Sequence, residues 1–384
     1  MVKLGDVAEI VSGSTPKTSV PEYWDGDIPW VTPKDLSEQS TLYISTGARS
    51  ITDNGRASAG LKLIPAGSVL WSSRAPIGLV AIATQPLATN QGFKNFVPGP
   101  KLNSEYLAHI LNYMRAPLQS YGSGATFKEV SATRAREIEI PLPPLGEQRR
   151  IAKVLGEVDQ QIESVRRKIG ALESARSALF DELMKDSGTQ FLQLGSLALQ
   201  KPDYGIGEAA GPFEPGKGRY LRITDINSDG TLNDEVVSPK GAVEELSPTK
   251  RLEVGDIVFA RSGATVGKTF LCTSEEDSHW FAGYLIRFKI DREKVDPRIV
   301  SDFCHSDSYA RWIANRQQAA AQPNINARIY SRELNVPVPL KATSRIYLEK
   351  RSLIQSIIGI HKEKITLLHE LKEACSLKGF AGAL

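Results

Sequence analysis

The feature that most constrains this chain is a long heptad repeat between Glu147 and Asp186. Its apolar residues follow one another mostly in steps of three and four, at Ile151, Leu155, Val158, Ile162, Val165, Ile169, Leu172, Leu179 and Leu183. This spacing places them on one stripe of a helix and is typical of a coiled coil. Pro143 and Pro144 precede the stretch and Gly188 follows it, so both helix ends are predicted. At about 1.5 Å per residue, about 40 residues would form a rod of about 60 Å.

A second copy of this pattern lies 196 residues further along the chain. The matched positions are Ile151 and Tyr347, Val158 and Ile354, Ile162 and Ile358, Ile169 and Ile365, Leu172 and Leu368, and Leu179 and Cys375. Arg176 and Lys372 occupy the same slot of the stripe, and a polar group there can fix the register of a helix pair. We therefore expect the two helices to pack on each other in antiparallel directions, related by a pseudo-two-fold axis.

The segments before the two helices also repeat, at an offset of about 190 residues. The matched runs are Leu4–Ala8 with Leu194–Ala198, Val31–Leu36 with Leu221–Ile226, Gly67–Trp71 with Gly255–Phe259, Ile77–Gly78 with Val266–Gly267, and Ile138–Pro143 with Leu334–Pro339. A repeat of this length is a domain duplication, because solenoid repeats are far shorter. The predicted order is a domain at 1–145, a helix at 146–187, a similar domain at 188–340 and a helix at 341–384. The expected fold class is α+β.

Local patterns within the first domain predict its elements. Residues 61–83 are interrupted by proline and glycine and favour three short strands separated by turns. A helix is expected at Ser104–Tyr113, with Ser104 as the N-cap. Residues 138–144 are expected to form a short strand that leads into the first long helix.

Charge is unevenly distributed along a chain whose net charge is only +3. Residues 39–104 hold six lysines and arginines against one acid, and residues 308–332 hold four arginines and no acid. Such local basic patches fit contact with phosphate groups, although solvated surface remains an equally good interpretation of charge alone. Two similar domains held at a fixed spacing suit a long, periodic ligand, of which duplex DNA is the obvious candidate.

Two stretches could contact phosphates or bases. Gly263–Thr269 resembles a phosphate-binding loop but is one residue short, and its counterpart Arg74–Leu79 has no lysine, so a nucleotide site is not favoured. The glycine-rich stretch Ser120–Lys128 allows close approach to phosphate, whereas its counterpart Ala319–Asn326 offers amides that can read adenine. A flexible connecting loop is the competing interpretation. The candidate DNA-binding residues are Lys34, Arg49, Arg74, Lys94, Gly122, Ser123, Gly124, Thr126, Lys128, Lys217, Arg219, Arg222, Arg261, Ser262, Lys268, Gln322, Asn324, Asn326 and Arg328.

Nothing in the sequence nominates a catalytic or metal site. The five histidines are scattered, the three cysteines form no CxxC pair, and hydrolase and zinc-protease motifs are missing. The beginning of the chain has no signal-peptide pattern and no apolar run reaches membrane-spanning length. We therefore expect a cytoplasmic protein without membrane contact.

The whole pattern resembles the specificity subunit of a type I DNA restriction–modification system. The runs that carry the resemblance are Ile28–Leu36, Ala66–Leu70, Arg261–Lys268 and Ile140–Gln148, the last of which leads into the first long helix. The start of the second helix, Pro339–Ser344, departs from the family by lacking the Pro-Pro and Glu-Gln pairs.

The resemblance implies a subunit that is not itself catalytic. Each recognition domain would read one half of a bipartite duplex DNA site, and the helices would hold two methylation subunits. Those partners would bind S-adenosylmethionine and modify adenine, this chain would bind no cofactor, and restriction subunits are a further expected partner. Two alternatives stay open: a stand-alone DNA-binding regulator with a coiled-coil spacer, and a coiled-coil adaptor that binds only protein.

Overall fold

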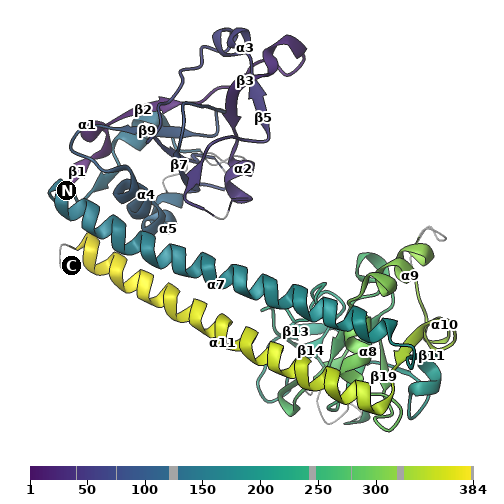
Figure 1. Ribbon diagram of the computed structural model, residues 1–384. Helices are drawn as coiled ribbons and strands as arrows, with labels where there is room; N and C mark the ends of the chain where they lie inside the picture. The colour runs from purple at the N-terminus through teal and green to yellow at the C-terminus, as the bar shows by residue number, and fades with distance from the viewer. Residues whose placement is uncertain are drawn as a thin grey trace. The chain divides into compact units, whose positions relative to one another are not determined.

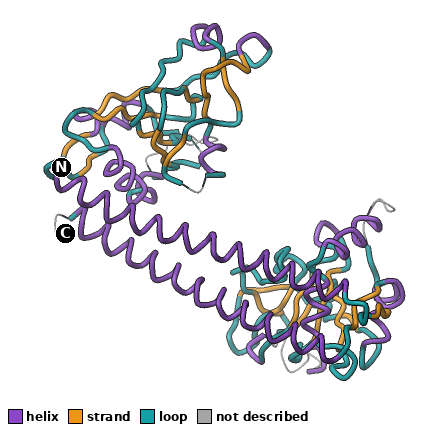
Figure 2. The backbone as a smooth tube through the Cα atoms, in the orientation of Figure 1, coloured by secondary structure: helices purple, strands orange, loops and turns teal. Residues whose placement is uncertain are grey.

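The computed structural model describes residues 1–39, 41–74, 76–120, 129–241, 248–277, 279–317 and 324–381. The chain divides into two compact units. The first comprises Met1–Ile169 and Ile360–Leu384, and the second comprises Gly170–Gly359. Each unit holds one domain of mixed strands and helices together with a segment of each of the two long helices (Figures 1 and 2).

The two long helices confirm the prediction from the heptad pattern. They are α7 (Leu145–Lys185) and α11 (Lys341–Phe380), drawn in teal and yellow in Figure 1. In the second unit, contacts between them run in opposite directions along the two helices, at Arg176 with Gln355, Phe180 with Tyr347, and Asp186 with Thr343. In the first unit, the α7 residues Ile151, Leu155, Val158, Ile162 and Val165 are all buried. The helix pair is therefore antiparallel, and its apolar stripe is the seam.

Two main sheets form the first domain. The five-stranded sheet has the order β2-β9-β6-β7-β4, and the three-stranded sheet has the order β5-β3-β8. A further antiparallel pair joins β1 to β10 beside the start of α7. The strands are β1 (Val2–Lys3), β2 (Ala8–Ser12), β3 (Trp24–Val31), β4 (Tyr43–Ile44), β5 (Arg49–Ile51), β6 (Val69–Trp71), β7 (Val80–Ala83), β8 (Ala88–Thr89), β9 (Lys94–Pro98) and β10 (Glu139–Ile140). The helices are α1 (Leu4–Val7), η1 (Pro21–Tyr23), α2 (Pro33–Ser37), α3 (Asp53–Ser58), α4 (Ser104–Tyr113), α5 (Arg115–Gln119) and α6 (Ala132–Arg136).

The second domain has one four-stranded sheet, of order β12-β19-β16-β17, and three strand pairs: β13-β15, β14-β18 and β11-β20. Its strands are β11 (Gln190–Gln193), β12 (Asp203–Tyr204), β13 (Ala210–Pro212), β14 (Tyr220–Leu221), β15 (Val237–Pro239), β16 (Asp256–Ala260), β17 (Thr269–Leu271), β18 (Trp280–Phe281), β19 (Leu285–Lys289) and β20 (Asn335–Val338). Its helices are η2 (Leu194–Leu197), η4 (Pro248–Lys250), η5 (Gly263–Thr265), η6 (Glu275–Asp277), α8 (Pro297–Phe303), α9 (Asp307–Gln317) and α10 (Ala327–Glu333).

Backbone contacts confirm that the two domains share one framework. The amide of Leu4 donates to the carbonyl of Ile138 at 2.8 Å, and the amide of Leu194 donates to the carbonyl of Leu334 at 2.9 Å. In both domains, the first strand of an antiparallel hairpin, β6-β7 or β16-β17, also pairs with a later antiparallel strand, β9 or β19. That later strand pairs on its other side with the first strand of the same sheet, β2 or β12. The tandem repeat in the sequence therefore corresponds to a repeat of strand pairing.

The structure corrects two local predictions. Of the three strands expected within residues 61–83, only β6 and β7 form, and the first stretch contributes a single bridge between Ile64 and Leu87. The helix α4 has the predicted bounds, but its N-cap is Asn103, whose side chain accepts from the amide of Tyr106 at 2.8 Å. Ser104 instead donates to the carbonyl of Gly67 at 2.6 Å. The expected strand at residues 138–144 is confirmed as β10.

Each domain contacts its own segment of the helix pair, through aromatic packing in the first unit and through a carboxylate in the second. In the first unit, Tyr106 of α4 packs edge-on against Phe380 of α11, with ring centroids 5.7 Å apart. In the second unit, Asp302 of α8 accepts hydrogen bonds from Tyr347 and Arg351 of α11. Across the described residues, no helix is long and apolar enough to cross a membrane.

Candidate nucleic-acid interface

The candidate interface of the first domain begins where two parallel strands, β3 and β8, end side by side. Val31 is in register with Thr89, and the next amide, that of Asn90, donates to the carbonyl of Val31 at 3.0 Å. Helix α2 starts directly after β3 through a capping box in which Asp35 accepts from the amide and the hydroxyl of Thr32, both at 2.7 Å. This local geometry brings α2 and the turn at residues 90–92 to the same edge.

A pocket of about 490 Å³ lies between this turn and α2. Its lining is mostly polar and includes Thr32, Lys34, Arg74, Asn90 and Gln91. Lys34 and Arg74 were predicted DNA contacts, whereas Asn90 and Gln91 were not singled out. The structure therefore brings two of the predicted cations together with two amide side chains.

Glu129 binds two cations, one of which, Arg74, lines this pocket. It accepts a hydrogen bond from Arg74 at 2.8 Å and one from Lys94 at 3.2 Å. Burial acts to raise the pKa of Glu129, but the hydrogen bonds from Arg74 and Lys94 outweigh it and hold the pKa below its usual value. Arg74 is 44% exposed and Lys94 only 8%, so Arg74 alone of the two can present its charge to a ligand. The prediction that Lys94 contacts DNA directly does not fit its burial.

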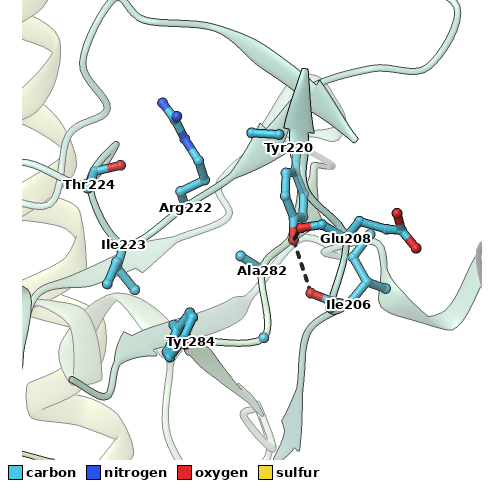
Figure 3. Close-up of a pocket in the computed structure, with 11 residues that line it drawn as sticks. Ile206, Glu208, Tyr220, Arg222, Ile223, Thr224, Ala282 and Tyr284 are labelled. Atoms are coloured by element: carbon cyan, nitrogen blue, oxygen red, sulfur yellow. Dashed lines mark hydrogen bonds between the residues drawn. The ribbon is translucent and has the colours of Figure 1, made fainter. Parts of the chain in front are cut away.

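The second domain repeats this edge with different side chains. Strands β14 and β18 are parallel, with Leu221 in register with Phe281, and the amide of Ala282 donates to the carbonyl of Leu221 at 2.9 Å. A pocket of about 390 Å³ opens beside them. Figure 3 shows it, with Arg222, Ile223 and Thr224 following β14 and Tyr284 following β18. The hydroxyl of Tyr220 donates to the carbonyl of Ile206 at 3.0 Å (Figure 3). Arg222, Ile223 and Thr224 are the repeat equivalents of Thr32, Pro33 and Lys34.

Arg222 is held by carboxylates at the start of this turn. Its guanidinium lies 2.7 Å from the fully buried Asp225 and 3.1 Å from Glu235. The hydrogen bond with Asp225 is the main reason that the pKa of Arg222 is raised, and Glu235 adds to it. Asp225 is the repeat equivalent of Asp35. In both domains this aspartate accepts a hydrogen bond from the backbone amide three residues before it, at the start of the turn.

Other predicted cations of the second domain are also used within the fold. The guanidinium of Arg219 donates to the carbonyls of Asn233 and Glu235, and Lys217 lies 3.1 Å from Glu214. Arg261 stacks over Tyr204, with its guanidinium carbon 5.1 Å from the ring centroid. These contacts fix the side chains in place, and DNA contact by any of them stays a prediction.

The stretch that resembles a phosphate-binding loop has a structural explanation. Gly263 and Gly267 have φ angles of +69° and +89°, which favour glycine, and the stretch continues into strand β17 rather than a helix. The ammonium of Lys268 donates to the carbonyl of Ile226 at 2.8 Å. The glycine spacing of this stretch therefore has a structural explanation, a turn between β16 and β17.

The remaining predicted residues separate into four groups. Ser262 forms an isolated bridge with Asn324, the repeat equivalent of the bridge between Arg74 and Glu129. Asn326 caps α10 by accepting from the amide of Ile329 at 3.0 Å, while Arg328 is exposed. In the first domain, Arg49 lies over the ring of Trp24 at 3.5 Å. The last group lies outside the described residues: Gly122, Ser123, Gly124, Thr126, Lys128 and Gln322.

Sequence reasoning missed Asn90, Gln91 and Tyr284. They follow strands of only two residues, which leave little periodicity to detect. An alignment of the two halves around residues 89–93 and 281–285 could have found them, since both runs contain a glycine before a buried strand.

Comparison with known proteins agrees with this architecture. Residues 1–174 match the family model of the type I restriction modification DNA specificity domain. The MjaIX specificity subunit of Methanocaldococcus jannaschii is 44% identical over 180 residues, which is 46% of this chain and 42% of that protein. The EcoR124I/EcoR124II specificity subunit of Escherichia coli is 28% identical over 175 residues, 42% of this chain and 41% of that protein. The chain therefore aligns with less than half the length of these relatives.

A solved structure resembles the chain over its whole length. The S subunit of a type I restriction–modification system from M. genitalium has a TM-score of 0.57 at 15% identity, covering 98% of this chain and 95% of that one. At this identity the likeness establishes the fold alone. Together with the family match, it agrees with the resemblance seen in the sequence: residues 1–174 match the type I restriction modification DNA specificity domain, and the chain has the fold of the solved S subunit.

Proposed function

We propose that this chain is the non-catalytic DNA-specificity subunit of a type I restriction–modification complex. The observation that carries the proposal is a site found in both domains. In each domain two parallel strands end side by side next to a pocket, and the backbone pairing is the same while the side chains that line the pocket differ. Two such sites in one chain suit two different half-sites of a bipartite duplex target. The match of residues 1–174 to a DNA specificity domain supports the same assignment.

The proposal assigns the helix pair to holding two methylation subunits. Helix α11 carries large apolar side chains that its own unit does not cover, at Ile360, Leu367, Leu371 and Leu377 in the first unit and at Ile346 and Leu353 in the second. Ile346 and Leu353, like Ile360 and Leu367, are seven residues apart and so share one face of the helix. Exposed apolar stripes of this kind support docking of partner helices, one methylation subunit on each unit.

The chemistry of methyl transfer would then lie on the partners. In this proposal the methylation subunits bind S-adenosylmethionine and modify adenine, this chain selects the sequence, and restriction subunits join the complete complex. We place the complex in the cytoplasm, where its DNA substrate lies.

Mapping of methylated adenines tests the proposal. The chain is co-expressed with the methylation subunits encoded by its host, and methylated positions are located across the genomic DNA. A bipartite motif with adenines methylated in both halves is the expected result, and it should disappear when this chain is omitted. Sequence-specific binding without co-purification of a methyltransferase would instead identify a stand-alone regulator. Absence of any salt-dependent duplex binding would identify a protein adaptor.

A further inference from the structure

The turn after β8 and the turn after β18 are equivalent residue by residue. Their first amides, on Asn90 and Ala282, donate to the ends of the neighbouring strands as described above. Two residues later, the carbonyl of Gly92 accepts from the amide of Ser73 at 2.7 Å, and the carbonyl of Tyr284 accepts from the amide of Arg261 at 3.1 Å. Asn90-Gln91-Gly92 in the first domain thus occupies the place of Ala282-Gly283-Tyr284 in the second.

The backbone around both turns is fixed by a glycine on the crossing segment. A Cβ on Gly13 would lie 1.9 Å from the carbonyl oxygen of Asn90, and a Cβ on Gly205 would lie 2.0 Å from that of Phe281. Neither position tolerates a side chain without displacement of the backbone. The two turns therefore keep the same path, and only their side chains differ.

The side chains of the first turn fit hydrogen bonding to a base. Gln91 is exposed, and its Oε1 accepts a hydrogen bond from the hydroxyl of Thr15. This contact orders the side chain before any ligand arrives, which lowers the entropy lost on binding. Lys34 and Arg74 line the same pocket and supply positive charge beside the amide. A duplex can then place its backbone on the cations and a base edge on Gln91.

The side chains of the second turn fit apolar contact instead. Glycine replaces the amide at position 283, and the adjacent Tyr284 is 60% exposed. The pocket behind it is lined by Ile206, Ile223 and Ala282, with Tyr220 held by its hydroxyl (Figure 3). An exposed aromatic ring over an apolar pocket can contact the C5 methyl group of thymine.

We propose that these two turns are base-reading elements, in which Gln91 reads an adenine of one half-site and Tyr284 contacts a thymine methyl of the other. The proposal rests on the DNA-specificity function proposed above. The physical basis for Gln91 is the bidentate match of its amide to the N6 and N7 edge of adenine in the major groove. Because Gly283 and Gly92 cannot make the contacts of their counterparts, the two half-sites must differ.

Selection from a random duplex library tests the first turn. The full chain, bound to its methylation subunits, enriches duplexes from the library, and the motif is compared with that of Gln91→Glu. The variant keeps the acceptor for Thr15 but exchanges the amide for a carboxylate, which accepts from N4 of cytosine. One adenine of one half-site should change to cytosine while the other half-site stays the same. Gln85→Glu is the matched control, since Gln85 is an exposed amide of the same domain that donates to Ser45, and its motif should not change.

The second turn is tested with Tyr284→Ala and Tyr284→Phe in the same selection. The alanine variant should lose the preference for thymine at one position of the other half-site, and the phenylalanine variant should keep it because the ring remains. Unchanged motifs for Gln91→Glu and Tyr284→Ala would overturn the proposal while leaving the specificity function intact, as would a change in both half-sites. If the wild-type complex enriches no bipartite motif, the proposed function fails as well.

Discussion

The ammonium nitrogen of Lys372 on α11 lies 2.6 Å from Oδ1 of Asp159 on α7. The positions 196 residues away hold a matching contact, in which the guanidinium of Arg176 donates to Oε1 of Gln355 at 2.9 Å. Each basic residue of the seam therefore meets a polar residue at the equivalent position of the other helix. This reciprocity is what antiparallel pairing of two copies of one helix produces, and it gives the polar seam slots a role in fixing register.

Replacing Lys372 with methionine should destabilise the first unit by about 1 kcal/mol, since the ion pair is only partly shielded from water. Its side chains are 27% and 37% exposed. Urea unfolding at low and high salt measures the effect, which should shrink as salt screens the charges. Arg345→Ala is the control, because its pair with Glu349 is largely exposed and should contribute almost nothing. Equal effects of the two substitutions would contradict a register role for Lys372.

The free energy of unfolding of the first unit should decrease as the pH is lowered from 6.5 to 4, because of His109. Burial lowers the pKa of His109 to about 4, Asp159 opposes this shift, and Lys372 adds to it. The unfolded chain, with an ordinary histidine pKa of about 6.5, takes up the proton more readily than the folded chain. The contribution of His109 to the free energy of unfolding is therefore complete above pH 6.5. It decreases on acidification, by about 2 kcal/mol at pH 5.

His109→Leu removes the titrating group and should flatten this part of the pH dependence. The readout is the difference in unfolding free energy between wild type and variant at pH 7 and pH 5, because carboxylates such as Glu129 titrate in both proteins. An unchanged slope in the variant would show that folding does not lower the pKa of His109.

The two long helices and the tandem domains could be predicted because their signals are local or repeated. A heptad stripe of nine apolar positions defines a helix face without knowledge of its partner. The repeat then supplied the partner, since a second stripe in the same chain has to be buried. Strand boundaries were less certain, because the short strands β6, β7 and β8 also pair with β9, β4 and β3, which lie further away in the sequence.

The role of individual cations could not be predicted from charge counting. Lys94 lies in a basic stretch of sequence, yet it is buried against Glu129, 35 residues away. Arg222 likewise belongs to a basic run but is bound to Asp225 and Glu235. Whether a basic side chain faces a ligand or a carboxylate depends on tertiary contacts, and so does the meeting of Lys34 with Gln91 in one pocket.

Exposed cations should therefore contribute to DNA affinity more than buried ones. Lys34→Ala, Arg74→Ala and Arg328→Ala should each weaken binding to all duplexes and reduce the slope of log K against log salt by about one unit. Lys94→Met should leave that slope unchanged and lower thermal stability, because it removes a partner of Glu129. A slope change for Lys94→Met, or none for the three exposed residues, would reverse this assignment.

Exchange of the first domain should change one half-site only. Residues 1–145 are replaced by the corresponding domain of a relative with a different target, and the methylated motif is determined. The strands β1 and β10, which pair the beginning of the domain with its end, both lie within the exchanged segment, so the exchange leaves this pairing intact. A motif altered in both halves would show that the two domains do not read DNA independently.

The helix pair should set the spacing between the half-sites. Helix α7 is continuous from Leu145 to Lys185, so a change in its length acts on the connection between the two domains. Inserting one heptad in both helices, after Ile169 and after Gly359, keeps the seam in phase and adds about 10 Å, which corresponds to about three base pairs. Library selection with variable spacers should then favour a spacer about three base pairs longer. Four residues inserted only after Ile169 rotate the seam relative to α11 and should lower affinity for every spacer. An unchanged spacer at normal affinity for the paired insertion would mean that the domains or the docked methylation subunits determine the distance.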